Sequence, residues 1–196
     1  MAHRHFMEGP LERSSRVFFS ASPLNELQTK VLEKEVKTWS RSEIAKGFAD
    51  GSKRLLRTLR KCPRSMWRFT LRKDHWTIQQ VLWHLADQEA NLYVRLRLAA
   101  AQPGSKVPAY DQNIWADKLA YLKADPIQAR DLVVLLRDSN ADLWKRLPSK
   151  AWGQKVHHPE WGTLTLGFLL NRNIWHLEHH LRQMERRFRE WKARKG

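Results

Sequence analysis

The sequence is poor in cysteine and has no long apolar segment. Its single cysteine, Cys62, cannot form an internal disulfide or a thiolate metal cage, so any metal site must use nitrogen or oxygen ligands. No apolar run approaches the roughly 20 residues that span a bilayer, and the apolar patch at residues 17–19 is too short for the core of a secretory signal. We therefore expect a cytoplasmic protein without a membrane span.

Acidic residues are also scarce, because 20 Asp and Glu stand against 36 Lys and Arg and give a formal net charge of +16. Residues 51–73 contain no acidic residue at all. Basic residues recur there at helical spacing and form what we call the basic stripe: Lys53, Arg57, Arg60, Lys61 and Arg64. Such a stripe fits either a solvated helix face or contact with a polyanion such as nucleic acid, and charge alone does not decide between them.

Capping signals mark the starts of four long helices. Ser40–Glu43 and Thr77–Gln80 both have the capping-box pattern, in which a hydroxyl side chain stands three residues before a Glu or Gln. Asp125–Pro126 is a third helix start, with proline at the first helical position. Apolar periodicity predicts a last helix at about Thr165–Arg194. The chain therefore reads as all-α, with the fold class of a four-helix bundle.

The bundle is expected to occupy residues 40–196, after an N-terminal extension of residues 1–39. A chain of 196 residues suits one domain with an extension better than two domains. Ser22–Pro23 resembles a helix start inside the extension, and residues 149–162 are expected to form a loop. The third long helix is expected to bury a single face, composed of Leu132, Leu136, Ser139, Leu143 and Leu147.

Three histidines, His176, His179 and His180, crowd one turn of the predicted last helix. At about 100° per residue, His176 and His180 fall on the apolar face, and His179 lies toward its rim. The i, i+4 spacing of the first two lets one helix supply two nitrogen ligands to one ion. Without an ion they would be hydrogen-bonded core residues, because unsatisfied buried imidazoles are costly. The spacing leaves both interpretations open.

A third possible ligand, His84, lies on the predicted second helix at the edge of its apolar stripe. Catalytic zinc sites usually have three protein ligands, and ligands on facing helices of a bundle converge in its core. Asp87 stands three residues later, where it either bonds His84 and fixes its tautomer or is a solvent-facing or salt-bridged residue. The histidines at the N-terminus, before the second helix and in the 149–162 loop are not expected to bind metal.

The sequence resembles the DinB/YfiT-like superfamily in three segments: "TIQQVLWHLADQE", "HPEWGTLTLGFLL" and "WHLEHHLRQM". The resemblance covers roughly residues 40–190. It implies an up-down-down-up four-helix bundle in which His84, His176 and His180 bind one divalent metal ion, Zn²⁺ or Ni²⁺. It also implies that Gln183 is either a packing residue or one that orients a histidine.

The resemblance further implies a metal-dependent enzyme that transfers a low-molecular-weight thiol to a small electrophilic substrate, or else a metal-dependent hydrolase. An ion bound by neutral imidazoles keeps its full charge, and it therefore stabilises a bound thiolate or hydroxide. The alternative is a non-enzymatic basic protein that binds nucleic acid or another polyanion through the basic stripe. An apolar bundle face could support a homodimer.

Overall fold

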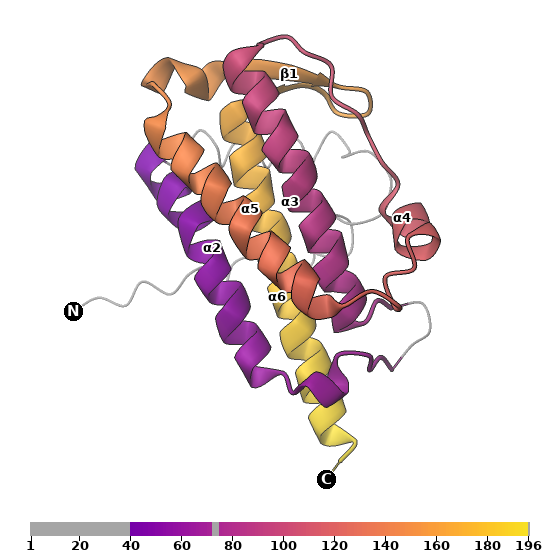
Figure 1. Cartoon of the computed structure of the whole chain (residues 1–196). Helices are drawn as coiled ribbons and strands as arrows, with labels where there is room; N and C mark the ends of the chain where they lie inside the picture. The colour runs from indigo at the N-terminus through magenta and orange to yellow at the C-terminus, as the bar shows by residue number, and fades with distance from the viewer. Residues whose placement is uncertain (1–39, 72–74, 196) are drawn as a thin grey trace, which may run out of the picture.

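The computed structural model describes residues 40–71 and 75–195 of the chain. Its four long helices are α2 (Arg41–Lys61), α3 (Ile78–Ala101), α5 (Pro126–Arg146) and α6 (Leu166–Ala193). Figure 1 shows α2 and α6 running in one direction and α3 and α5 in the other, so the up-down-down-up four-helix bundle is confirmed. The expected extension and its early helix lie outside the described residues, and that division of the chain stays a prediction.

The helix starts follow the capping signals of the sequence. The Ser40 hydroxyl accepts a hydrogen bond from the Glu43 backbone N–H at 3.2 Å, and the Glu43 carboxylate accepts one from the Ser40 N–H at 2.7 Å. Thr77 and Gln80 form the same reciprocal pair at the start of α3. Asp125 caps α5, with proline next to it. Each cap satisfies backbone donors that the first helical turn leaves without partners.

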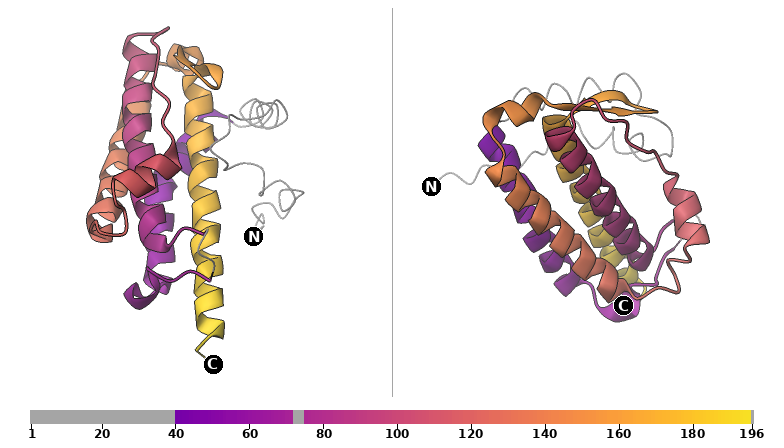
Figure 2. Two further views of the ribbon diagram at one scale, coloured as in Figure 1. Left: turned by 90° about the vertical axis from the view of Figure 1, so that its right-hand side faces the viewer. Right: turned by 45° about the horizontal axis from the view of Figure 1, so that its top comes forward.

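Two short elements were not anticipated between the long helices. A short helix, α4 (Gln112–Lys118), lies between α3 and α5. A hairpin of β1 (Lys155–His158) and β2 (Gly162–Thr165) stands where a loop was expected. It lies where α3 ends and α6 begins, at the opposite end of the bundle from the C-terminus (Figure 1 and Figure 2). Two single-turn 3-10 helices, η2 (Arg64–Met66) and η3 (Ser149–Gly153), complete the described elements.

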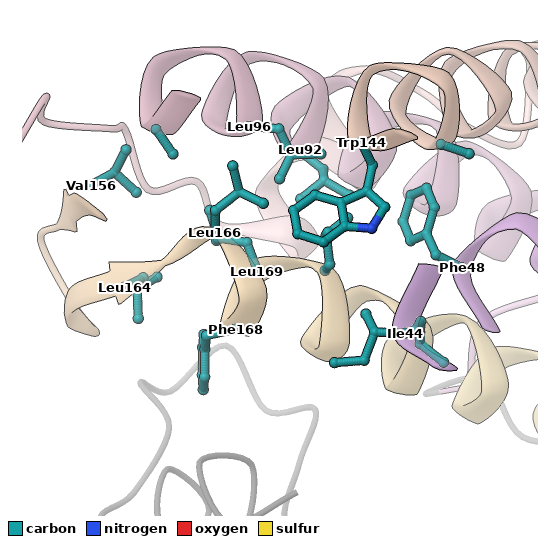
Figure 3. Close-up of a cluster of buried hydrophobic side chains, with 14 of the residues drawn as sticks. Ile44, Phe48, Leu92, Leu96, Trp144, Val156, Leu164, Leu166, Phe168 and Leu169 are labelled. Carbon is teal, nitrogen blue, oxygen red and sulfur yellow. The ribbon is translucent and has the colours of Figure 1, made fainter. Parts of the chain in front are cut away.

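The apolar core forms two clusters along the bundle. Figure 3 shows the cluster at the hairpin end, where Leu92 and Leu96 of α3 lie near Trp144 of α5, with Val156 and Leu164 of the hairpin beside them. The second cluster lies toward the other end and includes Leu55, Leu59, Val81, Leu82, Leu85, Val133, Leu177 and Met184. Burial of these side chains is the main force that holds the helices together.

A buried ion pair and its hydrogen bonds join all four long helices between the two clusters. Arg137 of α5 pairs with Glu89 of α3, and both side chains are at most 2% exposed. Arg137 also donates to Asn173 of α6 and, at 3.0 Å, to the Phe48 carbonyl of α2. Such a pair is stable in the core only when its remaining polar atoms find partners. Gly51 makes room for it, because a Cβ there would lie 2.2 Å from Arg137 Nε.

The buried face of α5 is therefore not the predicted leucine stripe. Leu132 is 37% exposed, and the buried positions of this helix are Ala129, Val133, Arg137, Asn140, Ala141 and Trp144. This face is turned by about one residue, or 100°, from the predicted one. The reason is Arg137, which the leucine pattern places outside the core and which the ion pair with Glu89 draws into it.

No helix in the described ranges is long and apolar enough to cross a bilayer.

Candidate metal centre

Three histidine rings from two helices meet in the core. His84 comes from α3, and its Nε2 lies 2.9 Å from Nε2 of His176 on α6. His180, one turn further along α6, has its Nε2 at 3.2 Å from the same atom of His176. All three side chains are at most 4% exposed. The structure thus brings together the three residues that the sequence singled out, and we call them the histidine group.

Burial keeps the histidine group neutral. Burial lowers the pKa of His84 and of His176 well below the ordinary value, and His180 and then Arg172 lower the pKa of both further. Burial also lowers the pKa of His180 to about 4, although its hydrogen bond with Gln183 acts in the opposite direction. A neutral imidazole has a lone pair on one nitrogen, which is the form that binds a metal ion.

Gln183 fixes the orientation of His180. Its Oε1 lies 2.8 Å from His180 Nδ1, and its Nε2 lies 2.7 Å from His179 Nε2. With the amide oxygen facing Nδ1, that nitrogen donates, and Nε2 of His180 keeps its lone pair toward the centre of the histidine group. Of the two interpretations of Gln183, orientation of a histidine is therefore the one that the contacts favour. His179 lies at the rim, half-buried, as its helical position predicts.

Asp87 does not bond His84. Its carboxylate instead accepts a hydrogen bond from the Tyr121 hydroxyl, and burial raises its pKa above the ordinary value. The Nδ1 of His84 has no hydrogen-bond partner among the described residues, and its ring packs edge-on against Trp76 with the centroids 5.0 Å apart. Of the interpretations left open for Asp87, the bond to His84 is thus wrong, because the carboxylate points toward the segment before α5.

The donor set fits a divalent metal ion. Two nitrogen ligands at about 2.0–2.1 Å from a tetrahedral ion lie roughly 3.3 Å apart. The separations of 2.9 and 3.2 Å in the histidine group are close to that value, and all three ligand atoms lie within 4.8 Å of one another. Three converging imidazole nitrogens cannot all satisfy one another by hydrogen bonds. Each close pair of nitrogens needs one proton between its two atoms, and His180 Nε2 carries a lone pair instead of a proton. A cation at their centre removes that conflict.

The remaining sequence candidates lie away from the histidine group. Cys62 is buried, and burial raises the pKa of its thiol to about 11, so it stays protonated and is a poor nucleophile. His157 is exposed on the hairpin and lies 2.9 Å from the Thr163 hydroxyl. All five residues of the basic stripe are exposed, and Lys61 pairs loosely with Glu185 at 3.9 Å.

Sequence reasoning missed two arginines on the helices that carry the histidines. Arg172 precedes His176 by one turn on α6, and Arg95 follows His84 by three turns on α3. Both spacings place an arginine on the same helix face as a histidine. That spacing was the available signal, but an arginine is normally assigned to the solvent-exposed side.

The chain is similar to proteins of known family. Residues 48–184 match the DinB superfamily. A protein from Oceanobacillus iheyensis, named as a candidate metal-dependent hydrolase, is 32% identical over 56% of this chain and 63% of its own length. The YfiT protein of Bacillus subtilis, named in the same way, is 29% identical over 56% of this chain and 62% of its own length. The chain thus spans less than two thirds of each of these curated relatives.

Two solved structures share the fold. The structure of YfiT from Bacillus subtilis, described as a four-helix bundle of unusual topology, has a TM-score of 0.71 at 23% identity, and the match covers 78% of this chain and 87% of that one. The mycothiol-dependent maleylpyruvate isomerase has a TM-score of 0.62 at 15% identity over 74% of this chain and 61% of its own. At these identities the likeness establishes the four-helix bundle alone.

Proposed function

The chain belongs to the DinB superfamily, and from that premise we propose that it is a metal-dependent enzyme whose divalent ion is bound by His84, His176 and His180. The observation that carries the proposal is the convergence of three buried, neutral imidazoles on one point. Zinc and nickel both accept such ligands. The names of the curated relatives, which describe metal-dependent hydrolases, support the same class.

The reaction that we propose is transfer of a low-molecular-weight thiol to a small electrophilic substrate. A bound divalent ion would supply Lewis acidity that favours the thiolate near neutral pH. The chain would supply neutral ligands, which leave the charge of the ion undiminished, and Gln183, which holds His180 in place. Cys62 does not compete as nucleophile, because its thiol is buried and protonated. A fold neighbour that is named as mycothiol-dependent supports a thiol as cosubstrate.

Hydrolysis is the second candidate reaction, and the names of the curated relatives favour it. The same three imidazoles would serve it, with water in place of the thiol. The two reactions differ in one measurable respect, because only transfer consumes a thiol in proportion to product. A chromogenic electrophile such as chlorodinitrobenzene, assayed with and without cysteine, separates them.

The test of the metal site is elemental analysis of protein purified without a histidine tag. We expect about one zinc or nickel ion per chain in the wild type and almost none in His180→Ala, because two imidazoles hold a divalent ion weakly. His157→Ala is the matched control, since it removes an exposed histidine, and it should keep the metal. Wild-type protein without metal after reconstitution with zinc or nickel would exclude the proposed function.

Binding to a polyanion is the non-enzymatic alternative, supported by the exposure of all five residues of the basic stripe. Such binding would weaken steeply as salt concentration rises, because each phosphate contact releases a counterion. Affinity for a nucleic-acid oligomer that is strong at low salt, together with absence of bound metal, would favour this alternative over the enzyme.

A further inference from the structure

Two arginines near the histidine group have no carboxylate partner. In the ranges that the structure describes, no Asp or Glu oxygen lies within 4.0 Å of a nitrogen of Arg95 or Arg172. The contrast is Arg137, which is buried like Arg95 and pairs with Glu89. Arg172 is partly buried. Buried charges are normally paired, because their removal from water is costly. Arg95 and Arg172 thus depart from this rule, because neither contacts a carboxylate of the described residues.

Arg95 is only 3% exposed, yet its hydrogen bonds are few. Its Nη2 donates to the Pro108 carbonyl at 2.7 Å and lies 3.4 Å from His158 Nε2. Its Nε has no hydrogen-bond partner in the described part of the chain. His158 does not neutralise the charge, because an imidazole is neutral or positive, and burial, followed by Arg95 and Arg172, lowers the pKa of this one to about 4. Burial lowers the pKa of Arg95, and Glu160, whose side chain is exposed, acts to raise it without contacting Arg95, so the guanidinium has no negative group in direct contact among the described residues.

Arg172 donates no hydrogen bond to any described residue, and an aromatic ring positions it instead. Its Cζ lies 4.0 Å from the centroid of the Trp161 ring, and Cζ of Arg95 lies 5.9 Å from the same centroid. An arginine stacked on an aromatic face keeps its N–H groups available at the edge of the plane. Burial, followed by the charge of Arg95, lowers the pKa of Arg172 to about 10, so it stays charged at neutral pH.

Of the two arginines, Arg172 acts on the histidine group. Arg172 stands one turn from His176, which is about 6 Å along the helix axis, and its charge contributes to the lowered pKa of His84 and of His176. Tyr110 lies near both arginines: burial raises the pKa of this tyrosine to about 12, while Arg172 and Arg95 act to lower it. A negative group held by Arg172 would thus lie on the face of α6 that carries His176.

We propose that Arg172 and Arg95 bind an oxyanion, a carboxylate or a phosphate, carried by the substrate or the thiol that reacts at the histidine group. The planar guanidinium fork matches both groups, and two forks near one tryptophan ring, which also stacks on His158, would orient the ligand as well as attract it. This assignment rests on the proposed metal-dependent function and narrows its substrate class to anionic small molecules. The oxyanion supplies the contacting negative group that neither arginine has among the described residues.

The test is calorimetric titration of chelator-treated protein with two probes in separate arms, succinate for a carboxylate and inorganic phosphate for a phosphate, at constant ionic strength. Wild-type protein should bind at least one probe saturably. Arg172→Gln should weaken that binding about 10- to 100-fold, which corresponds to a charge-assisted hydrogen bond of about 1.5–3 kcal/mol. Arg172→Lys should restore part of the affinity. Arg186→Gln, which removes an exposed charge from the same helix, should bind like the wild type.

Zinc content, measured on the same samples after reconstitution, separates the two proposals, and thermal unfolding checks that each variant is folded. Equal affinity in folded Arg172→Gln and wild type, or no saturable binding of either probe, would overturn the oxyanion site and leave the metal function standing. Arg172-dependent binding in a protein that holds no zinc or nickel would support the oxyanion site and overturn the metal function. Arg172→Gln should hold as much zinc as the wild type.

Discussion

Gln183 connects His180 of the histidine group to His179 at its rim. Its Oε1 lies 2.8 Å from His180 Nδ1, and this contact sets which nitrogen of His180 faces the other two rings. We expect Gln183→Leu to weaken zinc affinity about 10- to 100-fold, as loss of a bond to a ligand histidine typically does. The measurement is competition between the protein and a chromogenic chelator for zinc.

The control for this change is Arg189→Gln, which alters an exposed residue of the same helix and should leave zinc affinity unchanged. Far-ultraviolet circular dichroism should show the same helix content in both variants. A zinc affinity of Gln183→Leu equal to that of the wild type would contradict a positioning role, and Gln183 would then be a packing residue.

At the scale of residues, the sequence predicts what depends on spacing along one helix. The shared face of His176 and His180 follows from their separation, and burial of His84 follows from its neighbours on α3. The hydrogen-bond partner of Asp87, Tyr121, could not be predicted in this way. Tyr121 lies in a connecting segment whose sequence has no apolar periodicity that would predict its path. The unpaired state of Arg95 and Arg172 also depends on contacts between distant segments.

At the scale of elements, α2 approaches α5 closely at Gly51. A Cβ at this position would lie 2.2 Å from Arg137 Nε, whereas a Cβ on Gly47, one turn earlier, would lie 3.4 Å from Ile174 Cδ1 in ordinary contact. Replacing glycine by alanine inside a helix usually stabilises it by about 1 kcal/mol. We expect Gly47→Ala to be neutral or stabilising, and Gly51→Ala to lower the free energy of unfolding by about 1–3 kcal/mol through overpacking.

Urea unfolding of the two alanine variants beside the wild type checks this expectation. Both changes add one methyl group to the same helix, so helix propensity cancels in the comparison. If Gly51→Ala were as stable as Gly47→Ala, the Arg137 side chain would have room to move, and the buried pair with Glu89 would not constrain the distance between α2 and α5.

The starts of the helices were easier to predict from the sequence than the faces that the helices bury. N-cap residues act locally, and the starts of α2, α3, α5 and α6 therefore follow from a few residues each. The buried face of α5 depends instead on Arg137, whose partner Glu89 lies on another helix. The hairpin was missed because its strands are four residues long, too short for an alternating pattern to stand out.

At the scale of the whole molecule, buried polar groups of the bundle are enclosed by its two apolar clusters. The Arg137 and Glu89 pair lies between the clusters, and the histidine group lies among residues of the second one, such as Leu85, Leu177 and Leu181. Apolar packing in both clusters stabilises the bundle, and this packing offsets the cost of several buried polar groups. The same arrangement holds the histidines away from water and keeps them neutral.

Buried neutral histidines make the stability of the metal-free protein depend on pH. His158 shares this property with the histidine group, because burial, followed by Arg95, lowers its pKa to about 4. In the unfolded chain a histidine takes up a proton near pH 6.5. Between pH 6.5 and about 4 the unfolded state therefore binds more protons than the folded state, and the free energy of unfolding falls as pH falls. Each such histidine contributes up to about 1.4 kcal/mol per pH unit.

Urea unfolding of chelator-treated protein at several pH values between 7.5 and 4.5 measures this loss. The adjacent residues of the hairpin provide a matched pair: His158→Gln removes a buried histidine and should make the decline shallower, and His157→Gln, which removes an exposed one, is the control. The comparison between variants isolates the histidine, because Glu89, whose pKa burial raises, acts in the opposite direction in every sample. Identical slopes for His158→Gln and the wild type would mean that His158 takes up its proton equally in the folded and the unfolded chain.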